Sequence, residues 1–238
     1  MNILTVDTSG PIAGVSIITD GAIRYEASVC NKKTHSVNLM PMVDEAFTRS
    51  SLTVSDIDIY AAVVGPGSFT GVRIGVNTIR GMAHGVNKPV IGINALEALA
   101  CGVCATDMII CPIQDARAGQ VYGAVFESGM PPIRLMQDEA LILTEYLSKV
   151  CKLADSNRKF YFVGDGARVQ ENAIKEILGE RAVFAPAHLE MIRPASVAML
   201  ADCYKDSATS YNGLLPHYLR KPQAERAREA KLRGESNG

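Results

Sequence analysis

Residues 59–76, IYAAVVGPGSFTGVRIGV, join an apolar run to a helical pattern through a glycine-rich turn. The run predicts a buried strand, and residues 70–84 predict a helix. A glycine turn between a strand and a helix often holds a phosphate group. This turn lacks the lysine of a P-loop, and Thr70 stands where the dinucleotide fingerprint has its third glycine. Neither standard phosphate loop fits, although backbone amides here could still face an anion.

The glycines of this segment indicate close packing instead. Gly71, Gly75, Gly81 and Gly85 form two pairs at a spacing of four residues. A glycine inside a helix costs about 0.5–1 kcal/mol, which a helix must recover through close contact. We therefore expect this helix to pack tightly, either within the chain or against a second chain. Ser68 or Thr70 is the expected N-terminal cap.

Working outward, the same order of predicted elements occurs twice. Three strands, a helix, a strand, a glycine turn, a helix, a short strand and a helix fill the first half, and the second half repeats this order. The pattern predicts two α/β units, each a mixed sheet with helices packed on it, and a cleft between them. We place the N-terminal lobe at residues 1–106, the C-terminal lobe at 107–219 and a charged tail at 220–238.

The predicted cleft is lined by the loops that follow strands. Asp7 and Asp115 end the first strand of each half. An aspartate in such a place orients a metal-bound phosphate or merely closes a turn, and the residues leave both readings open. The candidate cleft residues are Asp7, Thr8, Ser9, Gly65, Gly67, Ser68, Asp115, Arg117, Gly164 and Asp165.

Composition and charge exclude several classes of protein. The net charge is −1, so no global field favours nucleic acid or an anionic membrane. No apolar run reaches the roughly 20 residues of a membrane helix and no leader peptide is evident, so we expect a cytoplasmic protein. The four histidines form no H-x-x-x-H pair, and Cys101 and Cys104 form a lone C-x-x-C. We therefore predict no metal site.

Several motifs occur in a fixed order. They are VDTS (6–9), THS (34–36), GPGSFTGVRIGV (65–76), GINALEALA (92–100), DARAGQVY (115–122), GDGA (164–167) and LPHYLRKPQAE (215–225). Together they resemble the TsaB family (YeaZ-like proteins), which acts in the threonylcarbamoyl modification of tRNA adenosine. The resemblance implies the two-lobed fold of actin, Hsp70 and sugar kinases, built from duplicated RNase H-like βββαβα units.

The resemblance also implies a non-catalytic role. TsaB-like proteins pair with TsaD, the catalytic subunit that carries metal-binding histidines, and a small ATPase, TsaE, joins them. Contact with tRNA is expected mainly through the complex. The chain alone is expected to form a homodimer. It is expected to bind ATP or ADP only weakly, or only together with its partner. The face expected to meet TsaD or a second copy comprises His35, Val37, Met40, Val43, Phe47, Phe69, Gly71, Val72, Gly75, Thr78 and Met82.

Two other functions compete with this one. A small-molecule, ATP-dependent kinase of the same fold would recruit Asp7 or Asp115. A zinc peptidase would need the histidine pair that is missing. The basic tail either is solvated or contacts RNA.

Overall fold

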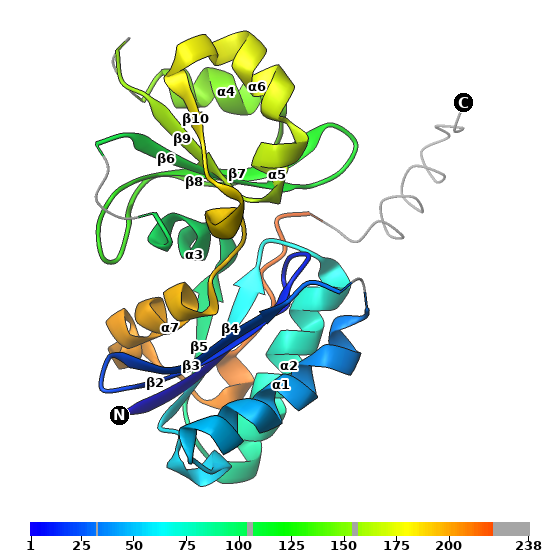
Figure 1. Ribbon diagram of the computed structural model, residues 1–238, viewed down its shortest axis with the longest axis vertical. Helices are drawn as coiled ribbons and strands as arrows, with labels where there is room; N and C mark the ends of the chain where they lie inside the picture. The colour runs from blue at the N-terminus through cyan, green and yellow to red at the C-terminus, as the bar shows by residue number, and fades with distance from the viewer. Residues whose placement is uncertain (32, 104–106, 154–156, 221–238) are drawn as a thin grey trace.

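A computed structural model describes residues 1–31, 33–103, 107–153 and 157–220, and shows two sheets stacked along the long axis (Figure 1). Cys104 and the tail after residue 220 lie outside the described residues. Each sheet has five strands. Residues 59–76 form a strand, a turn and a helix as predicted.

The first sheet has the strand order β3-β2-β1-β4-β5. Its strands are β1 (Asn2–Asp7), β2 (Ala13–Thr19), β3 (Ala22–Val29), β4 (Ile59–Gly65) and β5 (Val90–Asn94). β1, β2 and β3 are antiparallel, whereas β4 and β5 run parallel to β1. α1 (His35–Ser50) and α2 (Phe69–Val86) cover one face, where Leu4, Val6 and Tyr60 join the core.

The second sheet repeats this order as β8-β7-β6-β9-β10. Its strands are β6 (Ile109–Asp115), β7 (Gln120–Glu127), β8 (Ile133–Ile142), β9 (Phe160–Val163) and β10 (Ala182–Phe184). Its outer face packs against α4 (Leu143–Cys151), α5 (Asp165–Val169) and α6 (Glu171–Leu178). Three antiparallel strands followed by two parallel ones in both sheets confirm the predicted duplication.

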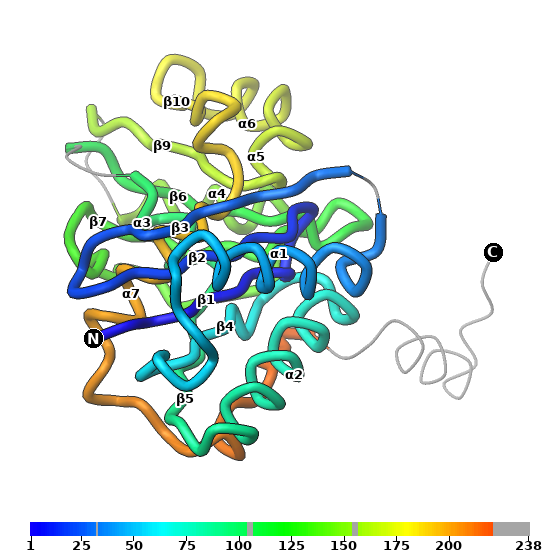
Figure 2. The backbone as a smooth tube through the Cα atoms, turned by 60° about the horizontal axis from the view of Figure 1, so that its bottom comes forward, coloured from blue at the N-terminus to red at the C-terminus, as the bar shows by residue number. Residues whose placement is uncertain are grey.

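Two helices tie the lobes together. α3 (Ala95–Cys101) lies between the sheets, and α7 (Pro194–Cys203) covers the remaining face of the first sheet (Figures 1 and 2). After α7 the chain stays with the first sheet, because Thr209 bridges Val90 and the His217 N–H donates to the Val64 carbonyl (2.7 Å). The sequence placed residues 107–219 in the C-terminal lobe. By their contacts, residues 194–217 instead belong to the first lobe.

A polar network reinforces this junction. Arg134 of β8 forms an ion pair with Asp138 and lies 3.9 Å from Glu97 of α3. Asn94 donates to Asp138, and the Tyr204 hydroxyl donates to Glu97. The Arg134 guanidinium also lies 4.5 Å from the centre of the Phe126 ring. The network joins β5 and α3 to the second sheet and to the end of α7.

Candidate functional site

Thr8 is inserted into the hydrogen-bond ladder of α2. The Gly75 N–H donates to Thr8 Oγ1 (3.0 Å), and the Thr8 hydroxyl donates to the carbonyl of Gly71 (2.7 Å). The hydroxyl thus joins two groups that are partners in an uninterrupted helix. At the start of the helix, Ser68 Oγ accepts from the Gly71 N–H (3.2 Å), which confirms the predicted cap.

The glycines of α2 divide into two kinds. A methyl group at Gly71 would lie 2.0 Å from the Thr8 carbonyl oxygen, and one at Gly75 would lie 2.6 Å from Thr8 Oγ1. Glycine is required there because the loop after β1 is pressed against the helix. A methyl group at Gly81 or Gly85 would meet open space instead, with no atom of the described residues within 4 Å. The first pair therefore serves packing within the chain, and the second pair leaves a smooth helix surface.

Asp7 is a buried carboxylate that closes a turn. Its Oδ1 accepts from the Ser9 N–H (2.8 Å) and from the Ser9 hydroxyl (2.7 Å). Its Oδ2 has no partner among the described residues, and the residue is only 1 % exposed. Burial raises the pKa of Asp7 above its ordinary value, against the lowering effect of the two bonds from Ser9.

The second lobe repeats this turn in a looser form. Asp115 Oδ1 accepts from the Arg117 N–H (2.9 Å), as Asp7 accepts from Ser9. Asp165 Oδ1 accepts from the N–H groups of Asp115 (3.3 Å) and Gly166 (3.0 Å). Burial is the main cause that raises the pKa of Asp165. Both strand-end aspartates thus serve their own turns, as the turn-forming reading expected.

Glycines hold these loops against each other in both lobes. A methyl group at Gly67 would lie 2.4 Å from the Ser9 carbonyl oxygen, and one at Gly164 would lie 2.2 Å from the Ile113 carbonyl oxygen. Gly65 is similarly close to the carbonyl of His217. The glycine turns are therefore filled by neighbouring backbone.

A narrow cavity separates the lobes. It is lined by Asp7, Gly10, Pro11, Ile12, Leu99, Gln114, Asp165, Glu190, Met191 and Ile192. The volume open to the centre of a water molecule is about 10 Å³, which suits a single water. Asp7 and Asp165 are the candidate cleft residues that meet here, whereas Thr8, Ser9, Gly65, Gly67, Ser68, Asp115, Arg117 and Gly164 do not line the cavity.

Sequence reasoning missed two polar residues of this cavity. Gln114 is buried, and in the part of the chain that the structure describes its Oε1 has no partner, like Oδ2 of Asp7. Glu190 pairs with Arg168 (3.0 Å). The signal for Gln114 is its position next to Asp115 on an otherwise apolar strand, whereas Glu190 lies in a connection with no motif.

Only some residues of the expected partner face are exposed. Val37 (58 % exposed) and Met40 (44 %) point outward from α1, and Thr78, Met82 and Phe47 are half-exposed. The interior contains Val43, Gly71, Val72 and Gly75. These four residues are therefore not part of an exposed partner face. Val43 lies on the side of α1 that packs on the sheet, with Leu39, Met42 and Ala46. On α2, Gly71 and Gly75 face Thr8, and Val72 joins the core. The buried side of α1 therefore includes Leu39 and Met42 and leaves Val37 and Met40 exposed.

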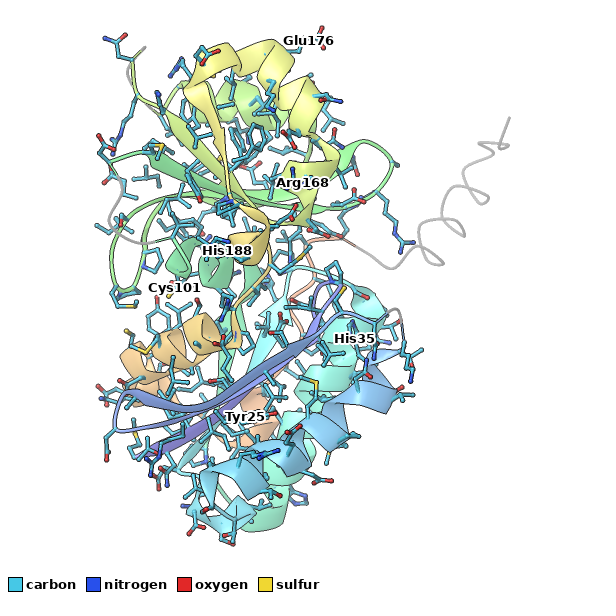
Figure 3. The ribbon with its side chains drawn as sticks, in the orientation of Figure 1. Tyr25, His35, Cys101, Arg168, Glu176 and His188 are labelled. Carbon is cyan, nitrogen blue, oxygen red and sulfur yellow. The ribbon has the colours of Figure 1, made fainter. Side chains whose placement is uncertain are left out.

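The remaining two members of that set have partners inside the chain. His35 Nε2 hydrogen-bonds the carbonyl oxygen of Gly10 (3.0 Å) at the start of α1 (Figure 3). Phe69 stacks on Tyr218, with ring centres 4.5 Å apart. Sequence reasoning missed Tyr218 because its contact joins residues far apart in the chain.

Within residues 1–31, 33–103, 107–153 and 157–220, no three His, Cys, Asp or Glu side chains gather as a metal site would require. In that same part of the chain, no helix has the length and apolar character needed to cross a membrane.

Duplicated βββαβα units with this strand order define the fold of actin, Hsp70 and the sugar kinases. A family model described as "TsaD: tRNA N6-adenosine threonylcarbamoyltransferase" matches residues 29–228. The chain belongs to the family of that model and, within it, to the TsaB (YeaZ-like) proteins.

Curated relatives and a solved structure agree with this assignment. TsaB of Bacillus subtilis is 31 % identical over 94 % of this chain and 96 % of its own length. TsaB of Escherichia coli is 30 % identical over 85 % of this chain and 88 % of its own length. The structure of YeaZ from Pseudomonas aeruginosa has a TM-score of 0.77 at 23 % identity, covering 92 % of this chain and 99 % of that one, and so shows the same fold.

Proposed function

We propose that this chain takes part in threonylcarbamoyladenosine biosynthesis in tRNA as an accessory subunit that binds a TsaD-like catalytic subunit. The curated relatives are named for that pathway, which supports the role. The chain itself carries no catalytic group in this proposal, and a TsaE-like ATPase joins the two subunits. The work is done in the cytoplasm.

The uncovered outer side of α1 and α2 is the observation that carries this proposal. We define the partner face as Val37 and Met40 of α1 with Thr78, Gly81, Met82 and Gly85 of α2. The two helices lie side by side (Figures 1 and 2). Two exposed apolar side chains and two open glycines let another helix approach closely, and such approach recovers the cost of glycine in a helix. In the absence of TsaD, a second copy covers the same face.

Binding can be measured by size exclusion with light scattering. The wild-type chain mixed with its TsaD-like subunit should elute as a mixed complex, and the double variant Val37→Glu/Met40→Glu should not. Charges buried in the apolar centre of an interface without partners weaken binding strongly. The matched control is Ile177→Glu, because Ile177 of α6 is 49 % exposed on the other lobe.

Two results would contradict the proposal. One is a wild-type chain that elutes separately from the TsaD-like subunit, both with ATP and without it. The other is a loss of the complex in Ile177→Glu that equals the loss in the double variant.

ATP or ADP binds this chain weakly, or only together with its partner. The cavity lined by Asp7 and Asp165 suits one water rather than a nucleotide, and the loops that could hold phosphate are occupied by backbone contacts. Calorimetry of the chain alone should give a dissociation constant no tighter than about 100 μM, near −5.5 kcal/mol. Tight, stoichiometric ATP binding or steady turnover with a small acceptor would favour the kinase.

A further inference from the structure

A second face of α2 carries basic and aromatic side chains. Phe69, Arg73, Arg80 and His84 follow one another at steps of four, seven and four residues, which places them on one side of a helix with 3.6 residues per turn. Gly81 and the rest of the partner face on α2 point roughly a quarter of a turn or more away from the middle of this side. The two faces of the helix are therefore distinct.

The segment after α7 lies along this side of α2. The Tyr211 ring is 4.4 Å from the His84 ring, and the Tyr218 ring is 4.5 Å from the Phe69 ring. Arg73 Nε donates to the Tyr218 hydroxyl (2.8 Å), and its guanidinium lies 3.8 Å from the centre of the Phe69 ring. Together Phe69, Arg73, Arg80, His84, Tyr211 and Tyr218 form what we call the α2 basic face.

The α2 basic face remains open to solvent. Arg73 and His84 are exposed, Arg80 is half-buried, and Tyr218 is 37 % exposed. Arg220 donates to the Ala116 carbonyl (3.1 Å), so the chain leaving Tyr218 reaches the loop that carries the exposed Arg117. Positive charge thus continues from α2 across the junction of the lobes.

The guanidinium groups of these arginines form no ion pair with the described carboxylates. Other arginines such as Arg49, Arg134, Arg158, Arg168 and Arg193 form ion pairs. In the described parts of the chain, no ion pair involves Arg73, Arg80, Arg117 or Arg220, and α2 has no acidic residue among its 18. In a protein of net charge −1, such a local concentration of unpaired cations fits a polyanionic ligand.

We propose that the α2 basic face binds the RNA backbone of the tRNA on which the complex acts. The choice of tRNA rests on the proposed function. Guanidinium groups form paired hydrogen bonds to phosphate, and exposed aromatic rings beside arginines stack on unpaired bases. From Arg73 to His84 the face is about 16 Å long at 1.5 Å per residue, enough for more than one phosphate. An acidic peptide would match the charges but would leave the rings unused.

The test uses the full chain, alone and mixed with its TsaD-like subunit, and an unmodified, fluorescently labelled tRNA transcript. Anisotropy is measured over a series of salt concentrations for the wild type, Arg73→Gln/Arg80→Gln, and Arg80→Gln alone. The control is Arg24→Gln, since Arg24 is exposed on β3 and also lacks an ion pair within the described ranges. The double variant should bind about 10-fold more weakly at low salt, with a log–log salt slope smaller by about 1 to 2. Arg24→Gln should match the wild type.

Three outcomes would overturn the inference. In the first, the double variant and Arg24→Gln have the same RNA affinity and the same salt slope. In the second, the wild type binds no tRNA, either alone or mixed with its TsaD-like subunit. In the third, the double variant loses the mixed complex but keeps its RNA affinity. The last would assign the face to an acidic protein. Light scattering on the same samples separates this inference from the proposed function. A wild-type chain that does not bind the TsaD-like subunit contradicts the proposed function. The RNA affinities of the variants, measured on the chain alone, still test the α2 basic face.

Discussion

Thr8 shows how one hydroxyl can position a whole helix. Its hydroxyl accepts a hydrogen bond from the Gly75 N–H and donates one to the Gly71 carbonyl, so the loop after β1 is fixed to the start of α2. The residue is buried, so water cannot replace the hydroxyl. The arrangement places the loop that follows Asp7 against the first turns of α2.

Replacing Thr8 with valine should destabilise the protein by about 1–3 kcal/mol, because it takes the hydroxyl partner away from two buried backbone groups. Thr8→Ser keeps the hydroxyl and should lose less than half as much. The free energy of unfolding in urea measures both. Equal losses in the two variants would show that the methyl group matters and the hydroxyl does not.

Asp7 should make stability depend on pH. Burial raises its folded pKa, so its stabilising contribution is complete below the ordinary aspartate pKa of about 3.9 and is lost as pH rises through the raised value. Asp165 acts in the same direction. Asp7→Asn keeps an oxygen for Ser9 and removes the charge, so it should raise the free energy of unfolding more at pH 7 than at pH 4.

Urea unfolding between pH 4 and pH 8 would measure this dependence. The profile of Asp7→Asn should be flatter than that of the wild type, and Asp44→Asn, at an exposed site on α1, serves as the control. An Asp7→Asn profile as steep as the wild-type one would show that Asp7 does not titrate in this range.

At the scale of elements, α2 uses its glycines for opposite purposes. Gly75 faces Thr8, whereas Gly81 faces open space. Gly81→Ala should therefore stabilise the isolated chain by about 0.5–1 kcal/mol, through better helix propensity. Gly75→Ala should destabilise it by about 1–3 kcal/mol, because the methyl group overpacks the Thr8 contact.

Thermal and urea unfolding of the two variants, measured side by side, would check the signs. Destabilisation by Gly81→Ala would mean that this glycine is covered in solution, for example by the second copy in a homodimer. Dilution of the sample would then distinguish that case, because dimer stability depends on concentration.

The elements themselves were predictable from local patterns, but their outward faces were not. Alternating and helical periodicity identified the strands and helices of both halves, and the repeated order identified the duplication. Which side of α1 is buried depends on the sheet beneath it, and a small displacement moved Val43 from the expected surface to the core. Tyr218 contacts Phe69 across a long stretch of chain, and the cavity that Gln114 lines is built from distant segments; spacing in the sequence encodes neither.

The whole molecule is held together by the helices between its sheets and by Arg134. This residue contacts Glu97, Asp138 and the Phe126 ring at the lobe junction. Arg134→Met should cost about 2–4 kcal/mol, since two largely buried carboxylates lose their counter-charge. The control Arg158→Met breaks a more exposed pair with Glu127 and should cost at most about 1 kcal/mol.

Urea unfolding followed by both circular dichroism and tyrosine fluorescence would test this role. In the wild type the two probes should report a single transition, whereas Arg134→Met should shift the midpoint and separate the two curves. Equal losses in Arg134→Met and Arg158→Met would show that the junction does not depend on this network.

The return of α7 and residues 209–217 to the first sheet also affects how the chain folds as it leaves the ribosome. Domains usually fold in the order in which they are synthesised. Here the first sheet, translated before the second, is completed only by a helix and a crossing segment that are translated after the second sheet. The second sheet, closed within residues 109–184, is complete sooner. The lobe whose strands are synthesised first therefore completes its folding after the other lobe. A nascent chain stalled before α7 would expose an apolar sheet face to chaperones.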